Sequence, residues 1–147
     1  MSRFKDWKQP IFSSDGIAYP NKDCMYAREH DYGWKCLHQQ NLVLGKGCDI
    51  GCFTFINAKY GVIIGKDVQI GSHCSIYSEN TEDKTKGKII IKEGTKIGTH
   101  STIMPNITIG KNVVVGAYSF VTKSIPDNAF VVGVPAKIKE KTNDTNI

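Results

Sequence analysis

The 147-residue sequence lacks the features that mark membrane, secreted or disulfide-stapled proteins. It has no run of about eighteen apolar residues, which a membrane-spanning helix requires. Residues 1–8 contain no apolar signal core and no small-residue cleavage site, so we expect a cytoplasmic protein. The cysteines at 24, 36, 48, 52 and 74 are odd in number and include no CxxC pair. We therefore expect reduced thiols, and neither a disulfide framework nor a cysteine-based zinc site.

The composition is that of a single globular domain, with 40% hydrophobic and 22% charged residues. Nineteen Lys and Arg against fourteen Asp and Glu give a net charge of +5. This mild excess does not require a nucleic-acid partner, because a phosphorylated small ligand would suit it equally well. We expect neither nucleic acid nor a membrane as a partner.

An aliphatic residue recurs at every sixth position, while the 3.6-residue periodicity of a helix is absent. Glycine follows seven of these twelve residues and marks corners, where it permits positive φ or a close approach of backbones. A unit of strand plus corner buries its apolar side only by coiling and stacking, which predicts an all-β parallel β-helix. Periodicity does not fix the hand, and the general rule for parallel crossovers would give a right-handed coil. The twelve positions, with a shift of two after the third and an interruption after the sixth, are Leu44, Ile50, Ile56, Ile64, Ile70, Ile76, Ile91, Ile97, Ile103, Ile109, Val115 and Val121.

The repeat divides the chain into three parts. Residues 1–40 lack it, are rich in aromatics and are predicted to form an N-terminal cap over the open end of the coil. Residues 41–138 form the repeat domain of about four coils, interrupted by a polar stretch at 78–90 that we expect to be an extruded loop. Residues 139–147 are predicted to be a flexible C-terminal tail.

The stretch 97–128, followed by Gly-Val-Pro-Ala-Lys at 133–137, resembles the C-terminal coils of the hexapeptide-repeat acyltransferases, which include sugar and nucleotide-sugar acetyltransferases. The ordered succession of Ile-Gly repeats, Val-Thr-Lys, Ile-Pro-Asp-Asn and Gly-x-Pro-Ala-Lys carries the resemblance. It implies a left-handed parallel β-helix and a homotrimer with active sites between subunits. It also implies acyl transfer from acetyl-CoA without a metal.

The same resemblance implies where the cofactor binds. In galactoside and maltose acetyltransferases, the positions that match Thr99 and Ala117 lie along the cofactor groove and meet the pantetheine arm. The positions that match Thr122 and Lys123 contact the nucleotide end, and Lys137 would meet the CoA phosphates as a point charge. The alternative is that Thr99 and Ala117 are small only because the coil is tight.

The catalytic base is where the sequence departs from the family pattern. Sugar O-acetyltransferases place a histidine at the start of the loop, whereas Thr81 stands at that position here and cannot accept a proton at neutral pH. His73 and His100 both stand third after an aliphatic position, so we expect them to stack roughly 5 Å apart on adjacent coils and flank the groove. Either histidine could replace the missing base, with His73 the favoured candidate and His100 the second, and His100 is also a candidate substrate-binding residue. Alternatively, one or both are outward surface residues.

Amino-sugar N-acyltransferases of the same fold resemble this pattern too, and some need no strong protein base because an uncharged amine is itself a good nucleophile. Glu79 and Asn80 stand in the matching loop region and could orient such an amine. Lys84 belongs to a run of five lysines that could bind a nucleotide diphosphate, unless the run is merely a solvated surface.

We therefore predict an acyl-CoA-dependent acyltransferase that transfers acetyl to the amino group of a nucleotide-linked amino sugar by direct attack in a ternary complex. The alternative is a sugar O-acetyltransferase of the galactoside or maltose type. A γ-type carbonic anhydrase would need three zinc-binding histidines, and the chain has no HxxxxH spacing. A non-catalytic scaffold is disfavoured by the retained motifs at 122–123 and 133–137.

Overall fold

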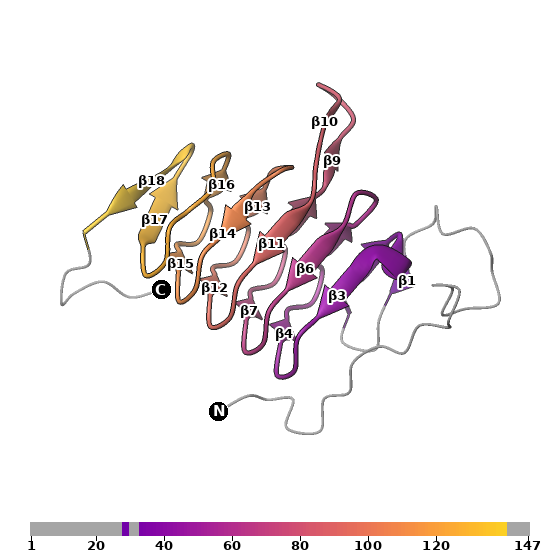
Figure 1. Cartoon of the computed structure of the whole chain (residues 1–147), viewed down its shortest axis with the longest axis horizontal. Coiled ribbons are helices and arrows are strands. Elements are labelled where there is room, and N and C mark those ends of the chain that lie inside the picture. The colour runs from indigo at the N-terminus through magenta and orange to yellow at the C-terminus, as the bar shows by residue number, and fades with distance from the viewer. Residues whose placement is uncertain (1–27, 30–32, 141–147) are drawn as a thin grey trace.

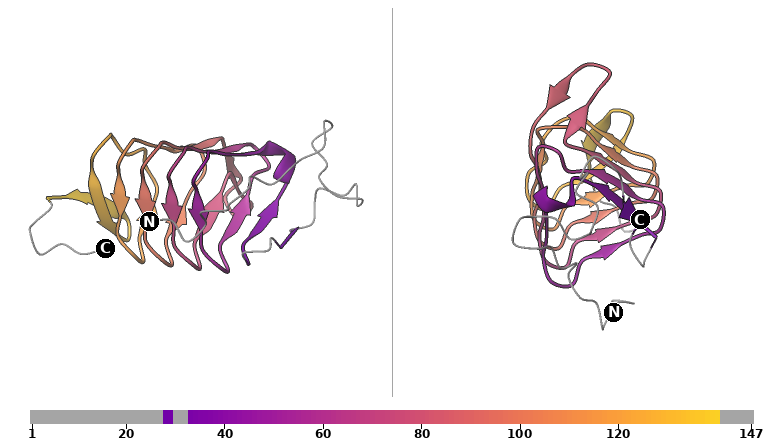
Figure 2. Two further views of the ribbon diagram at one scale, coloured as in Figure 1. Left: turned by 90° about the horizontal axis from the view of Figure 1, so that it is seen from below. Right: turned by 90° about the vertical axis from the view of Figure 1, so that its right-hand side faces the viewer.

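The computed structural model describes residues 28–29 and 33–140. Most of the predicted cap and tail lies outside these residues. The described chain is built from short strands that stack into a solenoid (Figures 1 and 2). Each turn contributes one strand to each of three faces, and the strands of successive turns pair in parallel within a face. The predicted all-β parallel β-helix is confirmed.

Each face is a ladder of strands from successive turns. The first face consists of β2 (Lys35–Leu37), β5 (Phe55–Asn57), β8 (Ser75–Tyr77), β13 (Thr102–Ile103) and β16 (Phe120–Val121), with β1 (Arg28–Glu29) antiparallel to β2. The second consists of β3 (Leu42–Leu44), β6 (Val62–Ile64), β11 (Ile89–Ile91) and β14 (Thr108–Ile109). The third consists of β4 (Asp49–Ile50), β7 (Gln69–Ile70), β12 (Lys96–Ile97), β15 (Val114–Val115) and β17 (Phe130–Gly133), with β18 (Ala136–Lys139) antiparallel to β17.

The solenoid has about five turns, one more than the repeat pattern indicates. The additional turn begins with β2, which precedes residue 41 and pairs in parallel with β5. A 3₁₀ turn, η1 (Gln39–Asn41), connects β2 to β3 and is the only helical element in the described part of the chain. No helix in this part is long and apolar enough to cross a membrane.

The repeated aliphatic residues form the core, as predicted. All twelve are buried, and none is more than 3% exposed. The small residues four positions later are buried as well, and the hydroxyl groups of three of them donate to carbonyls of the following turn. Thr54 Oγ1 donates to Gly71 at 2.8 Å, and Thr95 Oγ1 donates to Gly110 at 2.7 Å. The core is therefore apolar with its buried hydroxyls satisfied.

The corner glycines allow the backbones of adjacent turns to approach closely, and they do not adopt positive φ. A Cβ on Gly98 would lie 2.5 Å from the backbone nitrogen of Ala117, closer than real Cβ atoms come. Positive φ falls instead two residues later, for example at His100, where φ is 61°. Adjacent turns consequently pack backbone against backbone at these corners.

The interruption in the repeat is an extruded loop, as expected. It leaves the solenoid after β8 and forms a hairpin of β9 (Glu79–Asn80) and β10 (Thr85–Lys86) before returning to β11 (Figure 1). The main-chain N–H of Gly87 donates to the Ser78 carbonyl at 2.9 Å, so the two ends of the loop meet at the solenoid surface.

Candidate functional site

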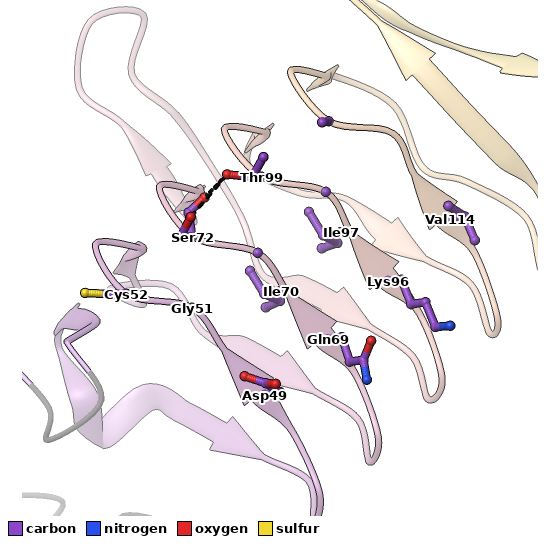
Figure 3. Close-up of a pocket in the computed structure, with 13 residues that line it drawn as sticks. Asp49, Gly51, Cys52, Gln69, Ile70, Ser72, Lys96, Ile97, Thr99 and Val114 are labelled. Carbon is purple, nitrogen blue, oxygen red and sulfur yellow. Dashed lines mark hydrogen bonds between the residues drawn. The ribbon is translucent and has the colours of Figure 1, made fainter. Parts of the chain in front are cut away.

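A groove of about 760 Å³ follows the edge where the third face turns into the first (Figure 3). In each turn the residue after the corner glycine is small, and these residues line the groove: Cys52, Ser72, Thr99 and Ala117. Strand residues including Asp49, Gln69 and Lys96 line its side. The structure thus places Thr99 and Ala117 together in one groove, one turn apart, with the Tyr118 N–H donating to the Thr99 carbonyl at 2.9 Å.

Hydrogen bonds connect the side chains of the groove across adjacent turns. Thr99 Oγ1 donates to the Ser72 carbonyl at 2.7 Å and lies 3.2 Å from Ser72 Oγ (Figure 3). The same oxygen lies 2.9 Å from Nδ1 of the His100 ring. Thr99 therefore connects the groove to the imidazole beside it.

Four aromatic rings on successive turns form a stack beside the groove, which we call the ring ladder: Phe53, His73, His100 and Tyr118. The ring centroids of His73 and His100 are 4.7 Å apart with planes 2° from parallel, and His100 and Tyr118 are 4.7 Å apart at 5°. Phe53 lies 4.9 Å from His73 at a tilt of 36°. All four residues have positive φ between 58° and 66° and are exposed. The predicted stacking of the two histidines is confirmed, with both rings on the surface and His100 connected to the groove through Thr99.

A second cavity, the hairpin pocket of about 360 Å³, lies at the base of β9. It contains Glu79, Asn80 and Thr81 from the extruded loop, together with Tyr77 and Phe120 from the first face. The Glu79 carboxylate is bound by Lys59 Nζ at 3.3 Å. The groove and the hairpin pocket share no lining residue, so Glu79 and Asn80 do not line the groove that contains Thr99 and Ala117.

The residues predicted to contact the nucleotide end or the phosphates lie on the surface outside both cavities. Thr122 and Lys123 follow β16 and are exposed, and Lys137 in β18 is exposed. Lys84 is an exposed hairpin residue with φ of 61°. This single chain does not bring these residues to the groove, and their roles stay predictions.

Sequence reasoning missed the groove residues Cys52 and Ser72 and the ladder residues Phe53 and Tyr118. Cys52 and Ser72 stand second after a repeated aliphatic residue, as Thr99 does, and Phe53 and Tyr118 stand third, as His100 does. The same spacing would therefore have identified them.

Cys36, Cys48, Cys52 and Cys74 are free thiols, and Cys24 lies outside the described residues. Burial raises the pKa of Cys36 and Cys74, and it raises that of Cys48 to about 11. Cys52 is half-buried at the groove. Within the described ranges, no three His, Cys, Asp or Glu side chains gather closely enough to hold a metal ion.

A family model matches residues 88–123, namely that of the bacterial transferase hexapeptide with six repeats. Galactoside O-acetyltransferase of Lactococcus lactis is 31% identical over 117 residues, which are 69% of this chain and 56% of the relative. Serine acetyltransferase of Buchnera aphidicola is 37% identical over 103 residues, which are 66% of this chain and 40% of the relative. The chain thus spans about half the length of the curated relatives it matches.

Two solved structures extend the comparison. A maltose O-acetyltransferase from Clostridium difficile is 29% identical with a TM-score of 0.58, over 76% of this chain and 65% of that chain. A serine acetyltransferase in complex with CoA is 26% identical with a TM-score of 0.58, over 69% of this chain and 40% of that chain.

Proposed function

We propose that this chain, which belongs to the hexapeptide-repeat acyltransferase family, is an acetyl-CoA-dependent acetyltransferase whose acceptor carries a hydroxyl group. The observation that carries the proposal is the groove of small side chains at the edge between the third and first faces.

The groove has the form that a pantetheine arm requires. Glycines at its corners let adjacent backbones touch, and the side chains lining it at Cys52, Ser72, Thr99 and Ala117 end within one or two atoms of Cβ. Such a strip accepts a thin chain and excludes a bulky ring. It also offers hydroxyl groups at Ser72 and Thr99 to the amides of the arm. Lys123 and Lys137 would meet the phosphates of CoA in the assembled enzyme.

Hydroxyl acceptors are favoured over amines because a galactoside O-acetyltransferase and several serine acetyltransferases are among the relatives above 30% identity. A sugar hydroxyl is the acceptor we favour. This reverses the order of our sequence-based expectation, which put N-acetylation of a nucleotide-linked amino sugar first.

N-acetylation of an amino sugar is the second candidate, supported by the hairpin pocket. Glu79 and Asn80 offer a carboxylate and an amide there, beside the aromatic rings of Tyr77 and Phe120. An amine would be oriented by these groups and would attack without a protein base.

Release of free CoA thiol from acetyl-CoA, measured with galactosides, maltose, serine and nucleotide-linked amino sugars, tests the proposal. We expect release with a hydroxyl acceptor from this panel. Release with the amino sugars alone would overturn the hydroxyl proposal and establish the second candidate. Comparison of the wild type with Glu79→Gln gives a second test. If the second candidate is right, this variant should impair amine transfer more than hydroxyl transfer, because the carboxylate orients the amine.

A further inference from the structure

Three polar groups lie within hydrogen-bonding distance of Thr99 Oγ1: the Ser72 carbonyl, the Ser72 hydroxyl and Nδ1 of His100. A threonine hydroxyl has one proton, and the Ser72 carbonyl, 2.7 Å from Thr99 Oγ1, can only accept. The Thr99 proton is therefore directed to that carbonyl. The His100 main-chain N–H donates to the same carbonyl at 3.1 Å, which holds the corner in place.

With the Thr99 proton on that carbonyl, the His100 ring is the donor in its contact with Thr99. Its Nδ1 lies 2.9 Å from Thr99 Oγ1, whose proton is already used, so the proton between them belongs to Nδ1. A neutral imidazole carries one N–H, and Nε2 consequently keeps a free lone pair. This is the form that a general base requires.

We infer that the Ser72–Thr99 pair holds His100 in the Nδ1–H tautomer, and that His100 Nε2 is the base that takes the proton from the acceptor hydroxyl. The inference rests on the proposed function. His100 is thereby a catalytic residue and Thr99 a positioning residue.

His73 differs from His100 in its surroundings. Its ring is packed between Phe53 and His100, at 4.9 and 4.7 Å. Within the part of the chain that the structure describes, this ring has no hydrogen-bond partner that would select one tautomer. Its contribution is to stack against His100 and fix the plane of that ring.

The proton balance of the step needs no further reactant. The acceptor oxygen forms a bond to the thioester carbonyl carbon while Nε2 takes the hydroxyl proton. The carbon–sulfur bond then breaks, and Nε2 returns the proton to the departing thiolate of CoA. The products are the acetyl ester and free CoA. His100 is neutral again, and its Nδ1–H still donates a hydrogen bond to Thr99 Oγ1.

Two matched variants separate the histidines. Phenylalanine preserves the ring ladder, and Phe53 and Tyr118 adopt the same positive φ in adjacent or nearby turns. We expect His100→Phe to lower kcat by about 100-fold or more, the usual scale for loss of a general base, with the KM for acetyl-CoA little changed. His73→Phe keeps an aromatic ring stacked on His100 and should therefore retain kcat within about threefold. Loss of kcat in His73→Phe with retention in His100→Phe would overturn the inference.

The tautomer is measured directly by ¹⁵N NMR of the histidine rings, without any substrate. The wild type should show His100 as the Nδ1–H form, Thr99→Ser should keep it, and Thr99→Val should lose it together with kcat. A wild-type His100 in the Nε2–H form would overturn the relay even if acetyl transfer is observed. Lack of transfer to every acceptor would overturn the proposed function and the base role, while the NMR result would still decide the tautomer.

Discussion

His73 and His100 occupy equivalent positions in successive turns, yet side-chain contacts make them chemically different. The sequence predicted their stacking, because residues third after the repeat position fall on the same corner of adjacent turns. It could not predict the hydrogen bond between His100 and Thr99, which depends on side-chain torsions. Nor could it predict that Ser72, one turn earlier, turns its hydroxyl toward Thr99. Column spacing determines which residues meet, and local torsions determine what they do.

The four described thiols should differ sharply in reactivity. Cys52 is half-buried in the groove, whereas Cys36, Cys48 and Cys74 are buried with raised pKa values and so remain protonated. In a Cys24→Ser background, an alkylating reagent should label Cys52 in the native protein and the others only after unfolding. Acetyl-CoA at ten times its Kd should slow Cys52 labelling by about tenfold. Equal labelling rates with and without acetyl-CoA, measured by peptide mass spectrometry, would contradict a cofactor in this groove.

A single core residue should account for several kcal/mol of stability. Ile103 is fully buried between the turns, and Ile103→Ala should lower the free energy of unfolding by about 2–5 kcal/mol. The matched control is Ile138→Ala, at a residue that is 63% exposed, where the loss should stay below about 1 kcal/mol. Chemical denaturation checks both, and equal losses would contradict the assigned core.

Among the elements, the strands of the regular repeat could be predicted and two others could not. β2 escaped detection because Cys36 takes the place of the aliphatic residue, in register with Ile56, and no glycine follows it. The pairing of β9 with β10 was missed because Glu79, Asn80, Thr85 and Lys86 are polar and show no alternation. The hairpin pocket, which depends on that pairing, could not be predicted either.

The β9–β10 hairpin should be separable from the solenoid. The Gly87–Ser78 hydrogen bond shows that its ends meet, so a two-residue Asn-Gly turn can replace residues 79–86. We expect the melting temperature to change by only a few degrees, and acetyl-CoA affinity to change less than about threefold, because the groove shares no residue with the hairpin pocket. Thermal melting checks the melting temperature, and calorimetric titration checks the acetyl-CoA affinity. The kcat/KM for the acceptor should fall. Loss of acetyl-CoA binding would contradict the separation of the two cavities.

At the scale of the molecule, the resemblance predicts a homotrimer with sites between subunits. The second face presents an apolar row of Val43, Ile63 and Ile90, which pair in register along β3, β6 and β11 and are partly or largely exposed. Thr122, Lys123 and Lys137 lie away from the groove of their own chain, as expected if a neighbouring chain completes the site.

Sedimentation equilibrium should give a mass three times that of the chain. Ile63→Glu should shift the protein toward monomer, because a charge would be buried without a partner in the interface. Lys46→Glu, at an exposed corner outside the groove, serves as the control and should leave the trimer intact. A monomeric wild type at micromolar concentration would contradict the assembly.

The central claim is that acetyl-CoA lies in the groove lined by Thr99 and Ala117, and calorimetric titration of acetyl-CoA tests it most directly. Ala117→Trp should fill the groove and weaken binding by about tenfold or more, a change of about 1.4 kcal/mol or greater. Lys92→Trp, at an exposed position outside the groove, is the control and should bind as the wild type does. Equal affinities for wild type and Ala117→Trp, or no binding by the wild type, would contradict the claim.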